Sequence, residues 1–498
     1  MKNLNKLCVA VIISASILFS PAIFAQSNKF SSDDFDKLCN DVFKEWNLPG
    51  MAVVVVKGGE TIFLKGYGTT AIDSTGTPIT PKTQFVIAST SKAMTAALLA
   101  TVIDEGKVKW EDTVVNHLPN FKLYDPWVTA NFQVRDIMVH KTGFRAYATD
   151  DLPHFGYNRD QVYRLLRHIQ PTYSFRTTYA YNNAMYTITA KIIEKYTNMS
   201  WDDAIVERIF KPLEMNSSTT GNRSYFSSPT LAKGHSHFMD KDTIKAVLRT
   251  DRDRAFRWLS AVAPAGFVIS TAEDMGNWLK MHLGKGKFNG KQIISETNHR
   301  YLFVPQTISG HDSVTLNNYA QGWTVEQSSN GRLIRHTGLA YGYTAFVGIM
   351  PEIDMGIAIL TNAGATTNPH MAITREMIEK LKGEDKRDWR EFYLSSFTRP
   401  RPITPQTKID TIPQLANIQY LGQFFKEDFG TITISEEENK LMFQLNNVKS
   451  ELRHKTGNAF NIRNISNIEL EFFPGNSNKI DALTLKIGDP IGNFVRIY

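Results

Sequence analysis

Apolar residues between positions 48 and 382 alternate between the spacing of strands and the spacing of helices. Apolar runs rich in β-branched residues predict strands, the first two joined as a hairpin by Gly58-Gly59, at residues 51–56, 61–66, 333–335, 345–350 and 355–361. Apolar residues three or four apart predict helices at residues 90–105, 185–196 and 272–283. Strands at both ends of this region, with helices between them, indicate an α+β fold in which an antiparallel sheet is flanked by helices.

The composition changes after residue 382. Residues 383–413 combine a cluster of charged side chains with four prolines, which restrict the backbone, and are predicted to be a semi-rigid linker. Short alternating strands separated by turn-rich pieces follow, at residues 431–434, 440–444, 469–473 and 482–487. This pattern predicts that residues 414–498 form an all-β module, a small barrel or sandwich.

The first residues have the order of a secretory signal. Lys2 and Lys6 precede an apolar stretch over residues 7–19, and Ala25 supplies a small residue at the expected cleavage site. The stretch is shorter than the roughly 20 residues that a membrane-spanning helix needs. We therefore expect a signal peptide over residues 1–25, a first folded domain over residues 26–382, and export to a periplasm or beyond. An uncleaved membrane anchor is the alternative.

Composition excludes several function classes. The formal charge of +7 is spread along 498 residues without a basic run interleaved with aromatics, so no nucleic-acid partner is expected. Cys8 lies in the predicted signal, which leaves Cys39 alone and excludes an intramolecular disulfide and a cysteine-based metal site. His235 and His237 lack the His-Glu-x-x-His context of a zinc hydrolase. We expect neither a metal nor a cofactor.

Ser89-Thr90-Ser91-Lys92 opens the first predicted helix. A serine hydroxyl is nearly inert until a base removes its proton, and a lysine three positions further along a helix lies on the same face. The N–H of Ser89 at the positive end of the helix can stabilise an oxyanion. A base role requires that burial or a neighbouring cation lower the lysine pKa. Taken alone, the motif is also compatible with Ser89 as a helix cap and Lys92 as a surface charge.

Tyr181-Asn182-Asn183 precedes the second predicted helix. A tyrosine beside a lysine can shuttle a proton between nucleophile and leaving group, and Asn183 offers a donor and an acceptor to a substrate amide. Core packing of Tyr179, Tyr181 and Tyr186 is the alternative. Tyr196-Thr197-Asn198 has a similar pattern, but it lies at a helix end, where Asn198 suits a left-handed cap.

A third motif, x-Thr-Gly, is expected on a strand that faces the site. Lys-Thr-Gly occurs at residues 141–143 and 455–457, neither of which has that context. His336-Thr337-Gly338 follows a predicted strand and both earlier motifs. Gly338 allows a close approach of the substrate backbone, and the N–H of Leu339 is a candidate second oxyanion donor. A purely structural strand histidine is the alternative for His336.

Together these motifs resemble the serine β-lactamase and penicillin-binding superfamily. Residues 85–94, 134–144 and 263–275 look like segments of that family, and the resemblance spans residues 48–382. It implies a helical subdomain beside the sheet and an acyl-enzyme on Ser89, with Lys92 and Tyr181 handling the proton. It also implies substrate binding by Asn183, His336, Thr337 and Gly338, and an oxyanion hole made by the N–H groups of Ser89 and Leu339.

The Tyr-x-Asn form resembles the class C and D,D-peptidase-like branch, from which the chain departs in two ways. His336 replaces a lysine that helps hold a substrate carboxylate, and residues 414–498 resemble an appended lipocalin-like domain. Both departures favour a peptidase or esterase over an efficient β-lactamase. We expect a small peptide, amide or ester substrate, and homo-oligomer formation is left open. The alternative is a non-catalytic scaffold that works through its β module.

Overall fold

The computed structural model describes residues 30–497 except for 241–242, 312–314, 329–330, 365–367, 385–386, 399–414, 464, 466–467, 476–478 and 488. The predicted signal peptide and positions 399–413 of the predicted linker lie outside the described residues. In the part of the chain that is described, no helix is both long and apolar enough to cross a membrane.

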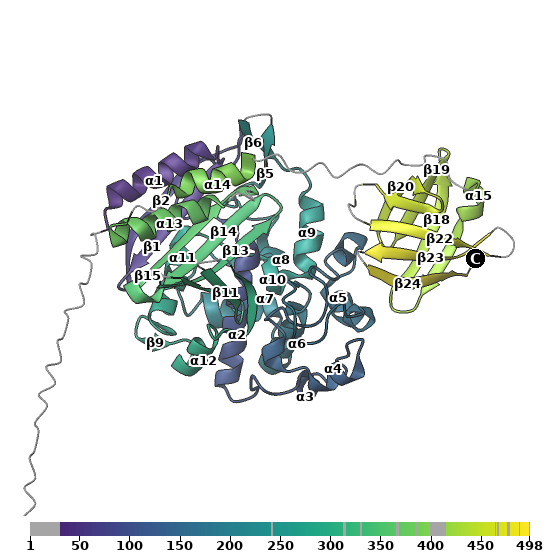
Figure 1. Cartoon of the computed structure of the whole chain (residues 1–498), viewed down its shortest axis with the longest axis horizontal. Helices are drawn as coiled ribbons and strands as arrows, with labels where there is room; N and C mark the ends of the chain where they lie inside the picture. Colours follow the sequence, from purple (N-terminus) through teal and green to yellow (C-terminus); the bar gives the residue numbers. More distant parts are fainter. Residues whose placement is uncertain are drawn as a thin grey trace, which may run out of the picture.

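An eight-stranded antiparallel sheet forms the centre of the larger part of the chain (Figure 1). Its strands, in the order in which they lie side by side, are β10 (Thr307–His311), β11 (Thr315–Tyr319), β12 (Thr324–Ser328), β13 (Gly331–Ala340), β14 (Tyr343–Met350), β15 (Met355–Thr361), β1 (Gly50–Lys57) and β2 (Glu60–Gly68). The predicted hairpin is β1 with β2, and the three later predicted strands are the neighbours β13, β14 and β15. The predicted antiparallel sheet is confirmed.

Both faces of the sheet are covered by helices. On β1, Met51 and Val53 pack with α1 (Ser32–Glu45) and α13 (Pro369–Lys382), whereas Val54 belongs to the core on the opposite face, which α11 (Ala272–Leu283) joins. Figure 1 shows α1 and α13 together on one side of the sheet. Because both faces are buried, β1 has a continuous apolar sequence instead of an alternating one.

Residues that were predicted to be part of the linker form a helix, α14 (Trp389–Thr398), which packs against α13. Arg390 at its start donates from Nε to Glu376 Oε1 at 3.1 Å and from Nη1 to Glu45 Oε1 at 3.0 Å. Arg390, from the segment predicted to be a semi-rigid linker, therefore forms ion pairs with α1 and α13.

A helical region lies below the sheet in Figure 1. It is built from α2 (Ser91–Asp104), α3 (Val114–His117), α4 (Pro126–Asn131), α5 (Arg159–Leu165), α6 (Tyr186–Thr197) and α7 (Trp201–Ile205). The three predicted helices correspond to α2, α6 and α11, and α2 packs against α6. A small sheet of β3 (Phe85–Val86), β7 (Val268–Ser270) and β4 (Thr219–Thr220) leads the chain into α2 through the 3₁₀ turn η1 (Ala88–Thr90).

The C-terminal module is a closed barrel of eight antiparallel strands. They are β17 (Gly422–Lys426), β18 (Gly430–Glu437), β19 (Lys440–Leu445), β20 (Val448–Thr456), β21 (Ala459–Ile462), β22 (Ile468–Pro474), β23 (Ile480–Ile487) and β24 (Asp489–Arg496), and β17 pairs with β24 to close the ring. Buried residues such as Phe424, Phe443 and Phe494 fill it, so the interior is a packed core. The predicted all-β module is confirmed as a barrel.

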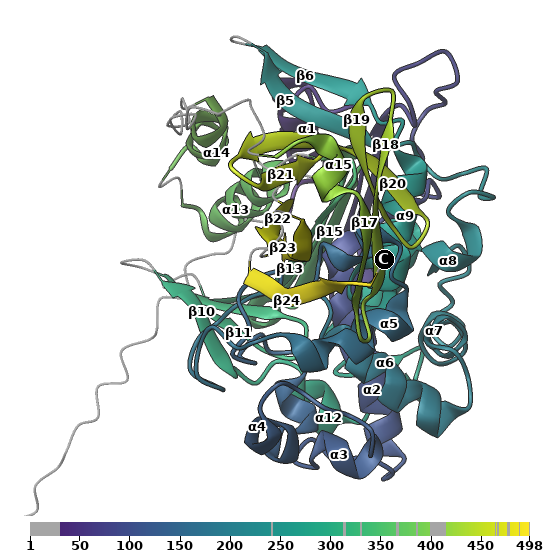
Figure 2. The ribbon, with the colours of Figure 1, turned by 90° about the vertical axis from the view of Figure 1, so that its right-hand side faces the viewer.

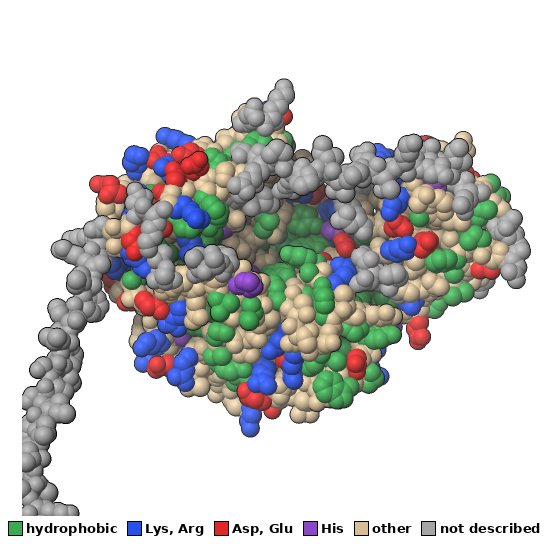
Figure 3. Space-filling model, in the orientation of Figure 1, with side chains coloured by type: hydrophobic (Ala, Val, Ile, Leu, Met, Phe, Trp, Pro, Cys, Tyr) green, Lys and Arg blue, Asp and Glu red, His purple; other side chains and the backbone are tan. Residues whose placement is uncertain are grey.

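The barrel rests on the helical region. Tyr157 Oη donates to the Phe429 carbonyl at 2.6 Å, and Asn446 Nδ2 donates to the Phe155 carbonyl at 2.9 Å. The Phe155 and Phe443 rings pack edge to face with 5.7 Å between their centres. In Figure 2 the barrel lies in front of the junction between the sheet and the helical region, and Figure 3 shows the surface hollowed beside it.

Candidate active site

Ser89 lies in the tight turn between β3 and α2, where it is partly exposed. The preceding residue, Ala88, has a φ of +47°, a left-handed conformation that is unfavourable for alanine. Thr90 Oγ1 donates to the Ile87 carbonyl at 2.7 Å, and Ser91 Oγ donates to the Ala88 carbonyl at 2.6 Å. These bonds hold the strained turn that presents the Ser89 side chain.

Lys92 is completely buried one turn further along α2, so it is not the surface charge of the alternative interpretation. Its Nζ donates to Ser89 Oγ at 3.1 Å, to Asn183 Oδ1 at 2.7 Å and to the Ala265 carbonyl at 2.9 Å. Burial lowers the pKa of Lys92 to about 7, against an opposing effect of the Asp150 carboxylate. A large fraction of the amine is therefore neutral near pH 7 and able to accept a proton.

Tyr181 comes from the loop before α6 and faces the same two groups. The Lys92 Nζ lies 4.7 Å from the centre of the Tyr181 ring, and the phenol hydrogen-bonds to Ser89. Burial raises the pKa of Tyr181 well above its ordinary value. The phenol therefore keeps its proton near neutral pH.

Asn183 links Lys92 to a carboxylate that sequence reasoning missed. Its Oδ1 accepts from Lys92, while its Nδ2 donates to Asp150 Oδ2 at 2.6 Å. Asp150 is buried, and burial raises its pKa to about 7, the nearby Asn183 and Lys92 acting in the opposite direction. Asp150 is one of two adjacent aspartates in a turn, so nothing in the local pattern distinguishes it. Only the fold brings it beside Asn183.

His336 lies on β13, at the edge of the site, and is buried. Its Nδ1 and the Thr337 carbonyl are 2.7 Å apart, so Nδ1 carries the proton, and Nε2 accepts from Tyr319 Oη at 2.8 Å. Burial lowers the pKa of His336 to about 3, with Lys92 adding to the effect. The ring is neutral and both its nitrogens have partners, so a substrate group would have to displace one of them.

Aromatic rings complete one wall of the site. His140 and Tyr181 have ring centres 4.3 Å apart, His140 and Tyr319 4.5 Å, and Tyr147 packs on Tyr181 at 5.6 Å. Tyr186 is buried in α6, and its ring centre lies 5.2 Å from Lys92 Nζ. Both Tyr181 and Tyr186 thus lie beside Lys92, and Tyr186 also packs in the core. Tyr147 and Tyr319 come from segments without a recognisable motif, whereas His140 belongs to residues 134–144, which already resembled a segment of the family.

Gly338 places the backbone of β13 directly against Ser89. A Cβ added to Gly338 would lie 2.2 Å from the Ile87 carbonyl oxygen and 3.0 Å from the Ser89 nitrogen. The next residue, Leu339, pairs with Thr344 of β14 and has a half-exposed side chain. The strand that carries the expected second oxyanion donor therefore runs beside the first.

We expect Gly338→Ala to lower kcat/KM by roughly 5- to 100-fold, because the new methyl group must push β13 away from Ser89. Gly310→Ala is the matched control, because it also adds a methyl group to a strand of this sheet but meets no atom within 4 Å. Steady-state kinetics and a thermal melt of both variants measure the effect. Equal activity of the two variants would contradict the close approach of β13 to Ser89.

The other copies of these sequence motifs make contacts outside the candidate site. Asn198 caps α6 with a φ of +53°, as predicted. Lys141 Nζ donates to the Gln306 carbonyl at 3.2 Å, and Lys455 forms an ion pair with Glu469 inside the barrel module. His235 and His237 contact backbone carbonyls instead of each other.

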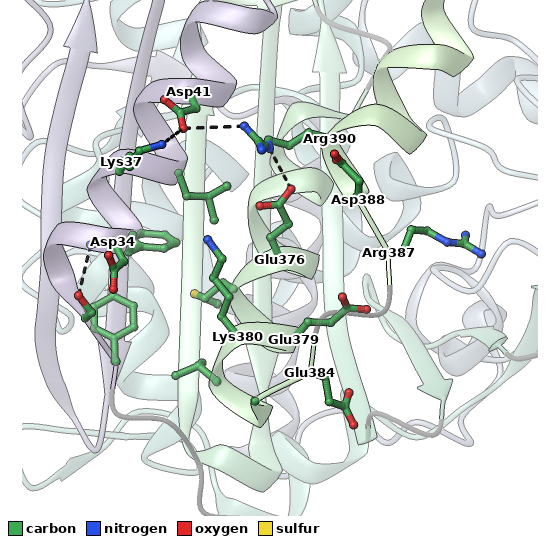
Figure 4. Close-up of a pocket in the computed structure, with 17 residues that line it drawn as sticks. Asp34, Lys37, Asp41, Glu376, Glu379, Lys380, Glu384, Arg387, Asp388 and Arg390 are labelled. Atoms are coloured by element: carbon green, nitrogen blue, oxygen red, sulfur yellow. Dashed lines mark hydrogen bonds and ion pairs between the residues drawn. The ribbon is translucent and has the colours of Figure 1, made fainter.

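A hollow of about 910 Å³ lies away from these residues, between α1, α13 and the segment before α14 (Figure 4). Arg390, Glu376, Asp41 and Lys37 form ion pairs across it. It lies on the face of the sheet covered by α1 and α13, opposite the core that contains α2. Its lining contains no group of the candidate site.

Comparison with known families agrees with this geometry. The sequence model of the family named Beta-lactamase matches residues 35–382, well over half of the chain. The chain belongs to the Beta-lactamase family. This family has a hydrolase fold, and the matched residues include each of the site residues described above.

Relatives of this beta-lactamase family member include fungal and bacterial proteins. "Unguisins hydrolase ungD'" of Aspergillus campestris is 28% identical over 439 residues, which cover 82% of this chain and 79% of the relative. "Protein flp" of Staphylococcus aureus strain MW2 is 22% identical over 356 residues, 68% of this chain and 65% of that protein. The family membership predicted from the three motifs is confirmed.

Two solved structures share the fold, including the appended module. The octameric penicillin-binding protein homologue from Pyrococcus abyssi superposes with a TM-score of 0.63 at 18% identity, over 92% of this chain and 98% of that one. SurE with D-Leu has a TM-score of 0.56 at 15% identity, over 94% and 99%. At these identities the likeness concerns the fold.

Proposed function

We propose that this chain is a serine acyl-transfer hydrolase in which Ser89 is the nucleophile and Lys92 the general base. The observation that carries the proposal is the buried Lys92 amine, 3.1 Å from Ser89 Oγ and with its pKa lowered to about 7. A scaffold has no need for a lysine desolvated beside a serine in a strained turn, since burying an amine costs free energy.

In the acylation step Ser89 Oγ attacks the substrate carbonyl while Lys92 takes the hydroxyl proton. The N–H groups of Ser89 and Leu339 stabilise the oxyanion, and the approach of Gly338 to the Ser89 nitrogen supports this pairing. The ammonium of Lys92 then returns its proton through the Tyr181 hydroxyl to the leaving amine or alcohol. In the second half water attacks the acyl-enzyme, Lys92 again accepts the proton, and Ser89 regains it as the acid leaves.

The substrate we propose is a small peptide, amide or ester with an uncharged group next to the scissile bond. His336 stands where a lysine would hold a carboxylate, and its lowered pKa leaves it neutral. The aromatic wall around Tyr181 suits apolar or backbone amide groups. A fold neighbour solved with D-Leu adds D-residues to the candidates.

A substrate panel on the purified full chain tests this proposal. It contains D- and L-aminoacyl amides, p-nitrophenyl esters, D-Ala-D-Ala peptides and a chromogenic cephalosporin. Turnover of amides or esters, with intact-mass spectrometry showing an acyl adduct on the Ser89 peptide, supports it. If the protein hydrolyses no substrate of the panel and forms no adduct, the result favours the alternative, a non-catalytic scaffold that works through its barrel.

The pH dependence follows from the Lys92 pKa. Because the base must be neutral, kcat/KM should rise with pH through about 7 and level off above it. Asp150 raises the pKa of Lys92, so Asp150→Asn should move this midpoint to lower pH by roughly one unit.

The matched control is Asp151→Asn, which removes the same charge one residue away. Asp150 Oδ2 accepts from Asn183 at 2.6 Å, whereas Asp151 interacts chiefly with arginines. The control should shift the midpoint less. A profile that is identical in wild type and Asp150→Asn would argue against Lys92 as the titrating base.

We also propose that the chain is exported, on the strength of the signal-like order of residues 1–25. Homo-oligomer formation is compatible with the octameric state named for one fold neighbour. Amino-terminal sequencing and light scattering of the secreted product test the two points.

A further inference from the structure

A cleft of about 770 Å³ lies between part of the barrel and the helical region, beside their contact. Arg145, Thr149, Arg167 and His168 line it from the helical side, and Lys426 lines it from the end of β17. None of the side chains that line it is an aspartate or a glutamate. The cleft is therefore walled by cationic and neutral groups from both modules.

The charges that face the cleft are only partly neutralised. His168 Nε2 pairs with Asp428 Oδ2 at 2.8 Å, and Arg145 faces Asp150 and Asp151. Arg167 and Lys426, in contrast, form no ion pair with any carboxylate that the structure describes. Two cations therefore remain for an anionic ligand.

Thr149 gives a second, independent indication of a ligand. Thr149 is only 3% exposed, it lines the cleft, and its Oγ1 has no hydrogen-bond partner among the described residues. Its φ of +70° is exceptional for a β-branched residue. Arg167 Nε is likewise buried without a partner in the described chain. Buried polar groups that lack a partner are expected to be satisfied by something that binds there.

The cleft adjoins the candidate active site. Thr149 immediately precedes Asp150, which contacts Asn183 at 2.6 Å, and Asn183 contacts Lys92 at 2.7 Å. The neighbouring Tyr147 N donates to the Tyr181 carbonyl at 2.7 Å. One chain segment thus touches the site residues and lines the cleft, and an extended peptide of three or four residues reaches roughly 10–14 Å.

We propose that this cleft binds a carboxylate of the substrate, remote from the scissile bond, through Arg167, Lys426 and the Thr149 hydroxyl. The inference rests on the proposed hydrolase function and adds a specificity to it. Peptides would be selected by a neutral group at Ser89 and an acidic group at their far end. Arg145 is not needed for this binding, because it already has partners of its own.

The test compares tripeptide p-nitroanilides and tripeptide amides that end, at the position farthest from the scissile bond, in a carboxylate or in the matching carboxamide. Both orientations of the peptide are made. We expect wild type to prefer the carboxylate by about tenfold in kcat/KM in at least one orientation. In Arg167→Met with Lys426→Met this preference should fall to about one.

Arg164→Met with Lys440→Met is the matched control. These substitutions also remove one arginine and one lysine, from exposed positions of α5 and β19 that do not line the cleft. Equal use of both end groups by wild type, in both orientations, overturns the proposal while turnover itself upholds the hydrolase. Loss of preference in the control pair overturns it as well.

Rates with added inorganic phosphate, compared with rates in potassium chloride of equal ionic strength, distinguish a carboxylate of the substrate from a free anion as the ligand of the cleft. Competitive inhibition of the carboxylate substrate alone supports a substrate carboxylate in the cleft. Activation of both substrates would make the cleft a site for a free anion and overturn the substrate assignment.

Discussion

Ser89→Ala should lower turnover of every accepted substrate by about 10³-fold or more and should abolish the covalent adduct. The change removes only the hydroxyl, and Ser89 is partly exposed in a turn held by bonds from Thr90 and Ser91, so the fold should survive. Intact-mass spectrometry and single-turnover kinetics measure the two effects, and a thermal melt checks that the protein is folded.

Ser227→Ala is the matched control, since Ser227 is exposed and lies far from the motif in sequence. It should keep full activity and labelling. If Ser89→Ala turned substrate over as fast as wild type, or still gave the adduct, the nucleophile would lie elsewhere and the proposed mechanism would fall with it.

Lys92→Met should be about as damaging as Ser89→Ala. Methionine preserves most of the buried volume but removes the amine that contacts Ser89 Oγ, Asn183 Oδ1 and the Ala265 carbonyl. Because nucleophile and base act as one unit, the double variant should be no slower than either single variant. Steady-state and single-turnover rates of the three variants provide the comparison.

Lys455→Met is the matched control for the loss of a lysine. Lys455 belongs to the Lys-Thr-Gly copy in the barrel and pairs with Glu469, outside the candidate site. It should leave kcat unchanged. Additive losses in the double variant would indicate that Lys92 contributes independently of Ser89, against its role as the base. An unfolded Lys92→Met is recognised from its melt, and Lys92→Arg, which keeps a charge but is a poor base, then serves instead.

These predictions separate the contribution of the nucleophile turn from that of its surroundings. In the proposed mechanism Lys92 acts as the base because burial lowers its pKa to about 7, with the Asp150 carboxylate opposing the shift. In the proposed substrate selection the barrel acts at a distance, through the cleft beside Thr149. The chemistry and the substrate preference are thus assigned to different segments, and each can be changed alone.

Much of the architecture follows from short-range patterns. The sequence of β1 is continuously apolar because the strand is buried on both faces. In β18 and β22, buried and more exposed residues alternate because only one face of each strand is buried. The strands that escaped prediction, such as β20 and β24, have charged or turn-forming residues at many positions and pair only because the barrel closes. The helix α14 escaped because its stability comes from ion pairs and packing with α1 and α13.

The site divides in the same way. The sequence predicted that Ser89 and Lys92 lie side by side, because residues three apart on a helix share a face whatever surrounds them. Motif spacing and order also indicated Tyr181, Asn183 and Gly338. The lowered pKa values of Lys92 and His336, the hydrogen bonds from Lys92 through Asn183 to Asp150, and the aromatic wall came only from tertiary structure. They depend on burial and on contacts between segments tens to hundreds of residues apart, which no local pattern encodes.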